Sequence, residues 1–579
     1  MLLIESGLVA VAVLVAVVYP GAASHFFGKI EHGVSQLARR RGLSILVVGV
    51  TTLSLRLALL PILSVPTPLV HDEFGYLLAA DTFAHGRITN PTHPMWTHFE
   101  TFSILQKPTY QSYAQPAQGL VLAAGQAIAA HPFWGVWLST GIMCAAICWM
   151  LQAWLPAEWA LLGAFLAVVR FGVFSYWANS YWGGALAATA GALVVGALPR
   201  IKEHQRLRDV LLLATGLGIL ANSRPYEGLV FSLPVAVALF AWPFGKDHLP
   251  FHIWFRRVVM PLCVVLAVTA AGMGYYFWRV TGNPFRLPYQ VERETYGVAP
   301  YLLWQSSKPQ PIYHHKDIQN VYANAEVTLY QVSRTPVGFV YVSAAKAWDA
   351  WRFFLGPALT LPVLMASLMG FSWRRISERT RFLLLAFAVS IAGLLLELFF
   401  FPHYAAPLTC LILALVLIAM RRLRLWQWHG NPSGLFLTRA IPAICVTMFL
   451  LRVSAATLHI PLTRSRAAAW YQAERLTPGR SEILSELQRL PGEQLVIVRY
   501  NPHRIPDEEW VYNQADIDSA KIVWARDMSP AENEELIGYY AGRHVWLLEA
   551  DARPPRLLPY GEADLTDTHP VAQSRKLSR

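Results

Sequence analysis

Two adjacent acidic residues, Asp72 and Glu73, directly follow a long apolar run in the segment His71-Asp-Glu-Phe-Gly-Tyr76. A positioned carboxylate can act as a general base that takes a proton from a hydroxyl group. Alternatively, Asp is a good N-cap residue and acids suit the first turn of a helix, so the pair could simply begin a surface helix. The pattern alone leaves both interpretations open.

Three further residues could stabilise negative charge at the same kind of position. Lys107 precedes a proline, Arg224 joins two apolar runs, and His403 opens another apolar run. Fixed cations of this kind bind phosphate groups and stabilise charge that develops during a reaction. Each also has an interpretation without a ligand. Lys107 could be an ordinary lysine at the membrane interface, Arg224 could form an ion pair with Glu227, and His403 could be an ordinary histidine at the interface.

Aromatic and amide side chains accompany these groups. Tyr76 follows Asp72 by four residues, Asn179 lies in a short polar turn, and Tyr289 and Tyr296 belong to a long loop rich in rings and charges. Such side chains suit the faces and hydroxyl groups of sugars as well as lipid headgroups. The loop could equally rest on a bilayer as an aromatic belt.

Membrane helices must position these residues. Of the 579 residues, 55% are hydrophobic and only 15% are charged, which is too apolar and too long for one soluble core. A span needs about 20 mostly apolar residues, and about 12 segments approach this requirement. They lie at roughly 2–20, 43–62, 133–154, 157–176, 183–199, 209–222, 226–243, 257–279, 352–371, 382–400, 404–420 and 435–454.

The net charge of +12 is spread over short Lys and Arg clusters between the spans, which argues against a nucleic-acid-binding domain. By the positive-inside rule these clusters face the cytoplasm. They comprise Arg39, Arg40, Arg41; Arg200, Lys202, Arg206, Arg208; Lys246, Arg256, Arg257; Arg374, Arg375, Arg379, Arg381; and Arg421, Arg422, Arg424. The first span is then a retained helix rather than a cleaved signal peptide, because its start carries Glu5 and no cation.

This threading predicts three parts. Residues 1–42 form an extra N-terminal membrane helix and a basic cytoplasmic loop. Residues 43–454 form a transmembrane domain with outer loops at about 63–132 and 280–351, the first containing a surface helix over 117–130. Residues 455–579 form an outer domain, in which strand-like runs at 494–500, 521–525 and 544–549 alternate with helix-like stretches at 464–476, 481–489 and 530–541. We expect a small α/β domain with a partly parallel sheet there.

The order of the outer-face motifs resembles the first outer loop of GT-C glycosyltransferases, in particular the protein O-mannosyltransferase family and the lipid A aminoarabinose transferases. Asp72-Glu73-x-x-Tyr76 is followed by His85-Gly86, by Lys107-Pro108 and by a surface helix that ends near residues 132–134. In that family the first-loop aspartate is catalytic. The resemblance therefore implies a catalytic Asp72, with Glu73 beside it, on an α-helical polytopic GT-C fold.

The same resemblance implies a donor phosphate held by Lys107, Arg224 and His403. The remaining candidates, Tyr76, Asn179, Tyr289 and Tyr296, would contact the sugar or the acceptor. Relatives often carry another acid in the second outer turn, where this chain has Asn179, so a divalent metal is only weakly supported and we expect no cofactor.

The predicted reaction moves a hexosyl or pentosyl group from a polyprenyl-phosphate sugar to a glycan, lipid or protein acceptor, on the outer face of a bacterial cytoplasmic membrane. Asp72 would be the base of an inverting single displacement. Two alternatives stay open, a lipid or sugar transporter or flippase and a sugar-polymer ligase. The notable charges lie at outer span ends rather than at the bilayer midplane, which favours an enzyme over a transporter. The Asp72-Glu73 pair argues against a ligase that relies on Arg and His.

Overall fold

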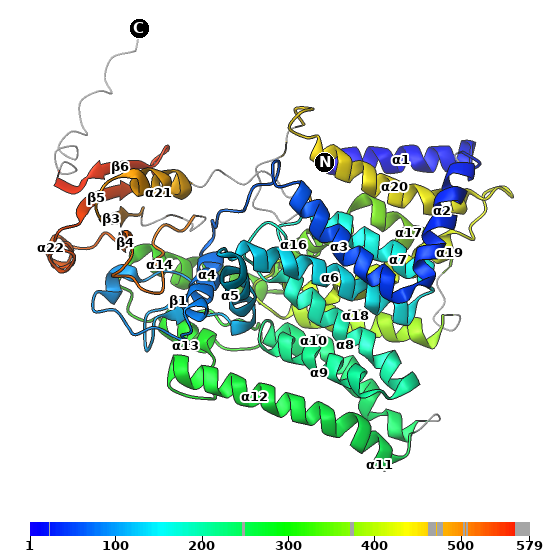
Figure 1. Cartoon of the computed structure of the whole chain (residues 1–579), viewed down its shortest axis with the longest axis horizontal. Helices are drawn as coiled ribbons and strands as arrows, with labels where there is room; N and C mark the ends of the chain where they lie inside the picture. Colours follow the sequence, from blue (N-terminus) through cyan, green and yellow to red (C-terminus); the bar gives the residue numbers. More distant parts are fainter. Residues whose placement is uncertain are drawn as a thin grey trace, which may run out of the picture.

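The computed structural model is mostly helical and describes residues 1–22, 24–245, 249–370, 376–460, 462, 470–471, 479–501, 504 and 508–561. Lys246, Arg374, Arg375 and most of the helix expected over 464–476 lie outside the described residues. The chain forms a long helix bundle with a small sheet domain beside one end (Figure 1).

Each predicted span falls on a helix of the bundle. In chain order these are α1 (Leu2–Val18), α3 (Arg41–Ala58), α6 (Phe133–Trp154), α7 (Ala157–Ala167), α8 (Gly184–His204), α9 (Leu207–Ala221), α10 (Pro225–Phe240), α12 (Met260–Thr281), α17 (Gly356–Leu368), α18 (Glu378–Leu395), α19 (Thr409–Leu423) and α20 (Ser433–Val453). Among the described residues, seven helices are long and apolar enough to cross a membrane. The shorter or more charged helices α1, α7, α9, α17 and α18 account for the larger number expected from the sequence.

The second outer loop is shorter than the sequence suggested, because its last part is the helix α16 (Pro336–Phe354). Helices α16 and α17 are bent by 104° at their junction and together give an eighth possible span. Lys346, Asp349 and Arg352 interrupt the apolar pattern of α16, which explains why its hydropathy does not reveal it. The amphipathic helix α2 (Ser24–Arg39) was also not predicted.

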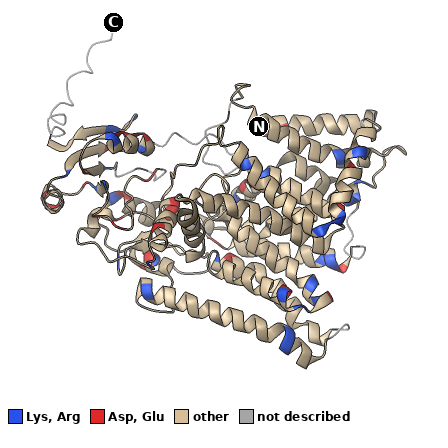
Figure 2. Ribbon diagram, in the orientation of Figure 1, with Lys and Arg blue, Asp and Glu red and all other residues tan. Residues whose placement is uncertain are grey.

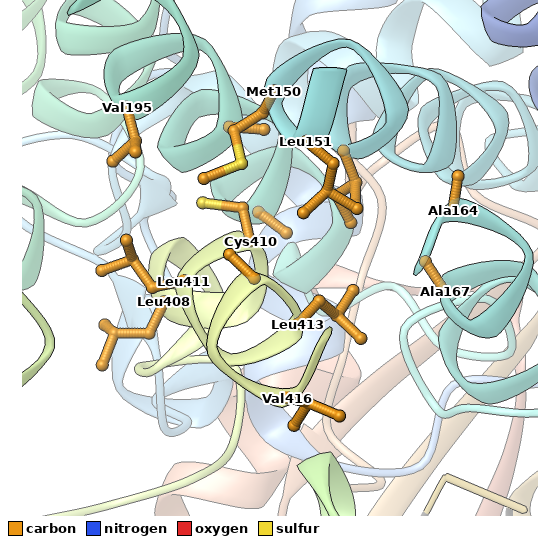
Figure 3. Packing of buried hydrophobic residues seen from close by; sticks show 14 of the residues in the cluster. Met150, Leu151, Ala164, Ala167, Val195, Leu408, Cys410, Leu411, Leu413 and Val416 are labelled. Atoms are coloured by element: carbon orange, nitrogen blue, oxygen red, sulfur yellow. The ribbon is translucent and has the colours of Figure 1, made fainter. Parts of the chain in front are cut away.

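Tight packing of small and aliphatic side chains forms the core of the bundle. Met150 and Leu151 of α6, Val195 of α8 and Leu413 of α19 meet there (Figure 3). At Gly191 of α8, a Cβ atom would lie 2.2 Å from a backbone oxygen of the segment before α19, so only glycine allows this approach. Small residues let membrane helices pack closely in this way.

A buried ion pair links α1 to the α16–α17 bend. Nη1 of Arg170 lies 2.9 Å from Oε1 of Glu5, and both side chains are completely buried. Arg170 also donates to the carbonyl oxygen of Leu355, and the backbone N–H of Ala358 donates to Glu5. Helix α1, which the sequence placed in a segment of its own, is thus joined to the bend at Gly356, whose φ is +59°.

We expect Glu5→Gln to destabilise the protein by about 3 kcal/mol or more, because it leaves the Arg170 guanidinium buried without a counter-ion. Glu31→Gln is the matched control, since Glu31 pairs with Arg439 but is 39% exposed, and partly exposed pairs contribute about 0–1 kcal/mol. Thermal melts in detergent measure both. Equal melting temperatures for the two variants would contradict a structural role of the buried pair.

Charge is distributed unevenly along the bundle. Figure 2 shows Lys and Arg gathered at the end of the bundle farthest from the sheet domain. This distribution agrees with the predicted side of the basic clusters. The N-terminus lies at the end of α1 that is nearer to the sheet domain (Figure 1).

The outer segments form a layer between the bundle and the sheet domain. They comprise α4 (His71–Ala84), the short strands β1 (Ile104–Leu105) and β2 (Gln111–Ser112), α5 (Pro116–Ala129), α13 (Pro288–Thr295), α14 (Lys316–Gln319) and α15 (Glu326–Ser333). Helix α5 is the predicted surface helix, and it packs against α4 and α6.

The C-terminal domain contains the predicted partly parallel sheet. Its strand order is β4-β3-β5-β6, in which β3 (Gln494–Arg499) pairs in parallel with β4 (Ile522–Arg526) and β5 (His544–Glu549). The antiparallel edge strand β6 (Arg556–Pro559) was not predicted. Helices α21 (Gly479–Arg489) and α22 (Pro530–Tyr539) match the expected stretches near 481–489 and 530–541.

This domain is docked directly on α4. The ring of Tyr512 lies 4.7 Å from that of Phe74, and the backbone N–H of Glu509 donates to the carbonyl of Leu69. An Arg526–Asp317 ion pair at 2.8 Å fixes the sheet to α14. The position of α4 therefore depends on both the bundle and the C-terminal domain.

Candidate functional site

Asp72 is the second residue of α4, and its carboxylate is the centre of a hydrogen-bonded cluster. Oδ1 accepts from the hydroxyl groups of Ser103 at 2.7 Å and Tyr113 at 3.0 Å, and Oδ2 accepts from the indole N–H of Trp182 at 3.1 Å. Nδ1 of His71 lies 3.3 Å from Oδ1. Donors from four separate segments therefore converge on one side chain.

The pKa values of Asp72 and His71 move apart. Burial works to raise the pKa of Asp72, but the positive charge and hydrogen bonding of His71, with the Ser103 hydroxyl, outweigh burial and lower it. Burial works to lower the pKa of His71, but the neighbouring Asp72 charge raises it above its usual value. The pair favours an ionised carboxylate beside an imidazolium.

Glu73 occupies a different environment from its neighbour. Its side chain is completely buried, Oε2 accepts from the backbone N–H groups of Leu69 and Val70, and Oε1 accepts from that of Tyr181. These contacts satisfy free N–H groups at the start of α4. We therefore assign Glu73 a capping role in place of the catalytic one expected from the sequence.

A polar cavity of about 160 Å³ lies beside this cluster. Tyr113, which donates to Asp72, is part of its wall, as are the predicted residues Tyr76, Arg224 and Tyr289. The other polar groups of the wall are Gln115, Ser223, Tyr226, Glu227, Tyr301, Glu397 and Tyr404. One cation, two carboxyl groups and several phenol rings are the groups expected around a ligand rich in hydroxyl groups.

Arg224 is the cation of this cavity. Its guanidinium lies 4.4 Å from the ring centre of Tyr404, and Nη1 is 3.6 Å from Oε1 of Glu227. The side chain is only 16% exposed. The ion pair with Glu227 that the sequence left open is present, but it is loose enough for the guanidinium to take another anion.

His403 is buried and does not act as a second cation here. Burial and the nearby Arg224 charge lower the pKa of His403 well below its usual value, so the ring is neutral. Its Nδ1 shares a hydrogen bond of 2.9 Å with the Tyr176 hydroxyl, and its ring lies 5.0 Å from that of Trp182. We therefore assign His403 to positioning Trp182, which in turn donates to Asp72.

The other predicted residues do not line the cavity. Lys107 is exposed and its Nζ lies 3.9 Å above the ring of Trp96. The amide of Asn179 donates to backbone carbonyls within its own turn, and the Tyr296 hydroxyl donates to Glu100 at 2.7 Å. The fold thus places Tyr76, Arg224 and Tyr289 on the cavity wall, connects Asp72 to that wall through Tyr113, and leaves these three residues apart.

Sequence reasoning missed Ser103, Tyr113 and Glu397. None belongs to a recognisable motif, and each reaches the site from a loop whose course depends on tertiary packing. Tyr301 and Trp182 lie in segments that the sequence already marked as polar and aromatic.

A second, larger cavity of about 570 Å³ opens between α16, α17, α18 and α19. Its wall is almost entirely apolar and includes Phe387, Phe400 and Ala405. The short segment 397–405 contributes to both cavities, with Phe399 and Tyr404 on the polar one and Phe400 and Ala405 on the apolar one. The two cavities are therefore direct neighbours.

Lys346 lies at the boundary between the apolar and the polar cavity. It lines the apolar cavity, and its Nζ donates to the carbonyl oxygens of Leu394 and Glu397. The side chain of Glu397 lines the polar cavity. Within the described residues, no group of three or more His, Cys, Asp or Glu side chains could hold a metal ion.

No family model and no curated protein matches the sequence. Among solved structures, the chain is similar to the oligosaccharyltransferase of Archaeoglobus fulgidus in its apo form, at 10% identity over 88% of this chain and 69% of that chain, with a TM-score of 0.48. It is also similar to ArnT from Cupriavidus metallidurans bound to undecaprenyl phosphate, at 10% identity over 90% of this chain and 94% of that chain, with a TM-score of 0.47.

The apo state of the same ArnT matches at 12% identity over 94% of this chain and 95% of that chain, with a TM-score of 0.46. ArnT and the oligosaccharyltransferase are GT-C glycosyltransferases, the group that the first outer loop of this chain resembles.

Proposed function

We propose that the protein is a membrane glycosyltransferase of the GT-C type, which transfers a sugar from a polyprenyl-phosphate-sugar donor to an acceptor hydroxyl group. The observation that carries this proposal is the shared wall at 397–405 between an apolar cavity and a polar one. A lipid-linked sugar has this same division, since a hydrocarbon tail is joined through a phosphate to a polar headgroup.

The donor fits the two cavities in one orientation. The apolar cavity of about 570 Å³ takes part of the prenyl chain, whose transfer from water favours apolar walls. Arg224 lies on the polar side and can pair with the donor phosphate. The sugar then lies among Tyr76, Tyr289 and Tyr301, whose rings and hydroxyl groups suit its faces and edges.

The reaction we propose is a single displacement with inversion. The acceptor oxygen attacks the anomeric carbon, the bond from that carbon to the phosphate oxygen breaks, and its electron pair leaves with the phosphate. Asp72 takes the acceptor proton as the new bond forms. Phosphate is a stable leaving anion, so the reaction needs a cation such as Arg224 rather than a second carboxylic acid.

We propose further that the site faces outward from a bacterial cytoplasmic membrane. The C-terminal domain and α4 share one end of the bundle, and the basic residues gather at the other end (Figure 2). The positive-inside rule supports this orientation. Hexosyl or pentosyl transfer to a glycan, a lipid or a protein is the expected chemistry.

The direct test is transfer by the purified protein from a synthetic polyprenyl-phosphate sugar to extracted envelope acceptors, followed by mass spectrometry. The proposal expects a product heavier by one sugar and release of polyprenyl phosphate. Movement of intact lipid-linked sugar across proteoliposome membranes without any sugar transfer would instead support the transporter alternative.

Filling the apolar cavity tests how the donor is held. Ala347 lines this cavity on α16, whereas Ala344, on the same helix and also exposed, does not. We expect Ala347→Trp to raise the KM for a long-chain donor about 10-fold, equivalent to about 1.4 kcal/mol, and Ala344→Trp to leave it unchanged. A donor with a two-isoprene chain should show a smaller difference. Equal effects of both tryptophans at every chain length would contradict tail binding in this cavity.

A further inference from the structure

We infer that Oδ2 is the atom of Asp72 that accepts the proton, and that Ser103 and His71 are a positioning pair that occupies Oδ1. This inference rests on the proposed function, in which Asp72 is the base. It extends that function by naming the reacting atom and two residues outside the family resemblance.

The two carboxylate oxygens carry unequal numbers of donors. Oδ1 has the hydroxyl groups of Ser103 at 2.7 Å and Tyr113 at 3.0 Å, with Nδ1 of His71 at 3.3 Å. Within the part of the chain that the structure describes, Oδ2 accepts only from the indole N–H of Trp182, at 3.1 Å. Each carboxylate oxygen offers about two lone-pair directions, so Oδ1 is saturated and Oδ2 keeps one direction open. An acceptor hydroxyl can therefore donate to Oδ2 without displacing a protein group.

Ser103 is held in an unusual backbone conformation that directs its hydroxyl to Asp72. Its φ is +64°, in the left-handed region that residues other than glycine seldom adopt. The backbone N–H of Tyr113 donates to its carbonyl oxygen at 3.1 Å. A Cβ atom at Gly75 would lie 2.8 Å from that same oxygen, so the loop passes directly against α4. Strain that the surroundings hold in place at such a site is often part of the mechanism.

His71 completes the pair. Its Nδ1 lies 2.8 Å from the Ser103 hydroxyl oxygen, and because that hydroxyl donates to Asp72, Nδ1 carries a proton and donates to Ser103. The carboxyl groups that raise the pKa of His71 electrostatically are Asp72 on α4, Glu292 on α13 and Glu509 before β4. The His71 charge in turn works to lower the pKa of Glu326 on α15. Burial works against the charged ring, but the neighbouring Asp72 charge raises the pKa of His71 above its usual value and favours the protonated ring.

The consequence is a base that is both oriented and kept ionised. The two hydroxyl donors on Oδ1 fix the plane of the carboxylate, and the imidazolium that donates to Ser103 adds its charge beside them, so that the open lone pair of Oδ2 has one direction. The same donors stabilise the charged form and keep the carboxylate from taking a proton from solvent in the resting enzyme. Removing any of them loosens the carboxylate and lets it protonate at higher pH.

The test is the acid limb of kcat/KM against pH for Ser103→Gly, Ser103→Ala and His71→Gln. Ser103→Ala removes only the hydroxyl, whereas Ser103→Gly removes the whole CH2OH group but suits the positive φ, so Ser103→Gly keeps the fold even if Ser103→Ala does not. Ser112→Ala is the control, because Ser112 is buried in the same hairpin but its hydroxyl accepts from Ala114 instead of contacting Asp72. Asp72→Asn is measured in parallel.

We expect the acid limb to move up by about 1 pH unit or more in Ser103→Gly and His71→Gln, with the kcat at the optimum within about 10-fold of the wild type. Ser112→Ala should overlay the wild type. Acid limbs that coincide in all these enzymes would overturn the inference, as would a Ser103→Gly enzyme as inactive as Asp72→Asn, because that would place Ser103 in the chemistry. Full activity of Asp72→Asn would instead overturn the proposed function itself.

Discussion

Asp72→Asn is expected to reduce sugar transfer 10²-fold to 10⁴-fold, about 3 to 5 kcal/mol of barrier, with little change in donor binding. Asparagine has nearly the size of aspartate but no proton affinity near neutral pH, so it removes the base and keeps the volume. Its amide oxygen can still accept from Ser103 and Tyr113. Its amide N–H groups then face the Trp182 indole N–H, a donor against a donor, so a thermal melt must accompany the assay.

Glu73→Gln supplies the contrast for this prediction. Because Glu73 is completely buried and accepts from backbone N–H groups beside α4, its loss should lower the melting temperature while the kcat of the molecules that remain folded changes little. A Glu73→Gln enzyme that is folded but inactive, beside an active Asp72→Asn enzyme, would move the base to Glu73 and contradict the site described here.

The comparison of Asp72 with Glu73 shows what sequence can and cannot supply. Adjacent residues on a helix point about 100° apart, so only one of two neighbouring acids can face a given site. Which one does so depends on how α4 is rotated by the C-terminal domain and by the turn at Tyr181. The sequence correctly marked the pair as unusual, but the choice between base and cap is a tertiary property.

The cations illustrate a second limit. The sequence offered Lys107, Arg224 and His403 as partners for a phosphate, and residue type and sidedness were all it could weigh. In the structure His403 is buried and neutral, Lys107 is exposed above Trp96, and Arg224 lines the cavity. Arg224 is also the one whose position on the predicted outer side runs against the positive-inside rule, which makes it the most unusual of the three in sequence.

Most helices and the C-terminal strands were predictable, because apolar length and the alternation of strands and helices depend on local sequence. The apolar cavity was not predictable. It needs the 104° bend between α16 and α17, and that bend is fixed by the Arg170–Glu5 pair, whose members are 165 residues apart. Contacts between residues so distant in sequence leave no periodic pattern.

Arg224→Gln is expected to raise the KM for the donor about 30-fold or more, since truncating a partly buried cation that binds a phosphate typically costs about 2 kcal/mol or more. Glutamine keeps a hydrogen-bonding end but is shorter and carries no charge. Arg224→Lys should recover part of the loss, because lysine restores the charge without the planar, bidentate geometry of arginine.

Lys107→Gln is the control for this prediction. Both residues were expected from the sequence to bind the donor phosphate, but only Arg224 lines the cavity that adjoins the proposed tail site. We therefore expect the KM of Lys107→Gln to change several-fold less than that of Arg224→Gln, measured with the same polyprenyl-phosphate sugar. If Lys107→Gln raised the KM as much as Arg224→Gln, the donor phosphate would have to lie near the Trp96 loop instead. The assignment of the polar cavity to the donor sugar would then fail, even with Asp72 still serving as the base.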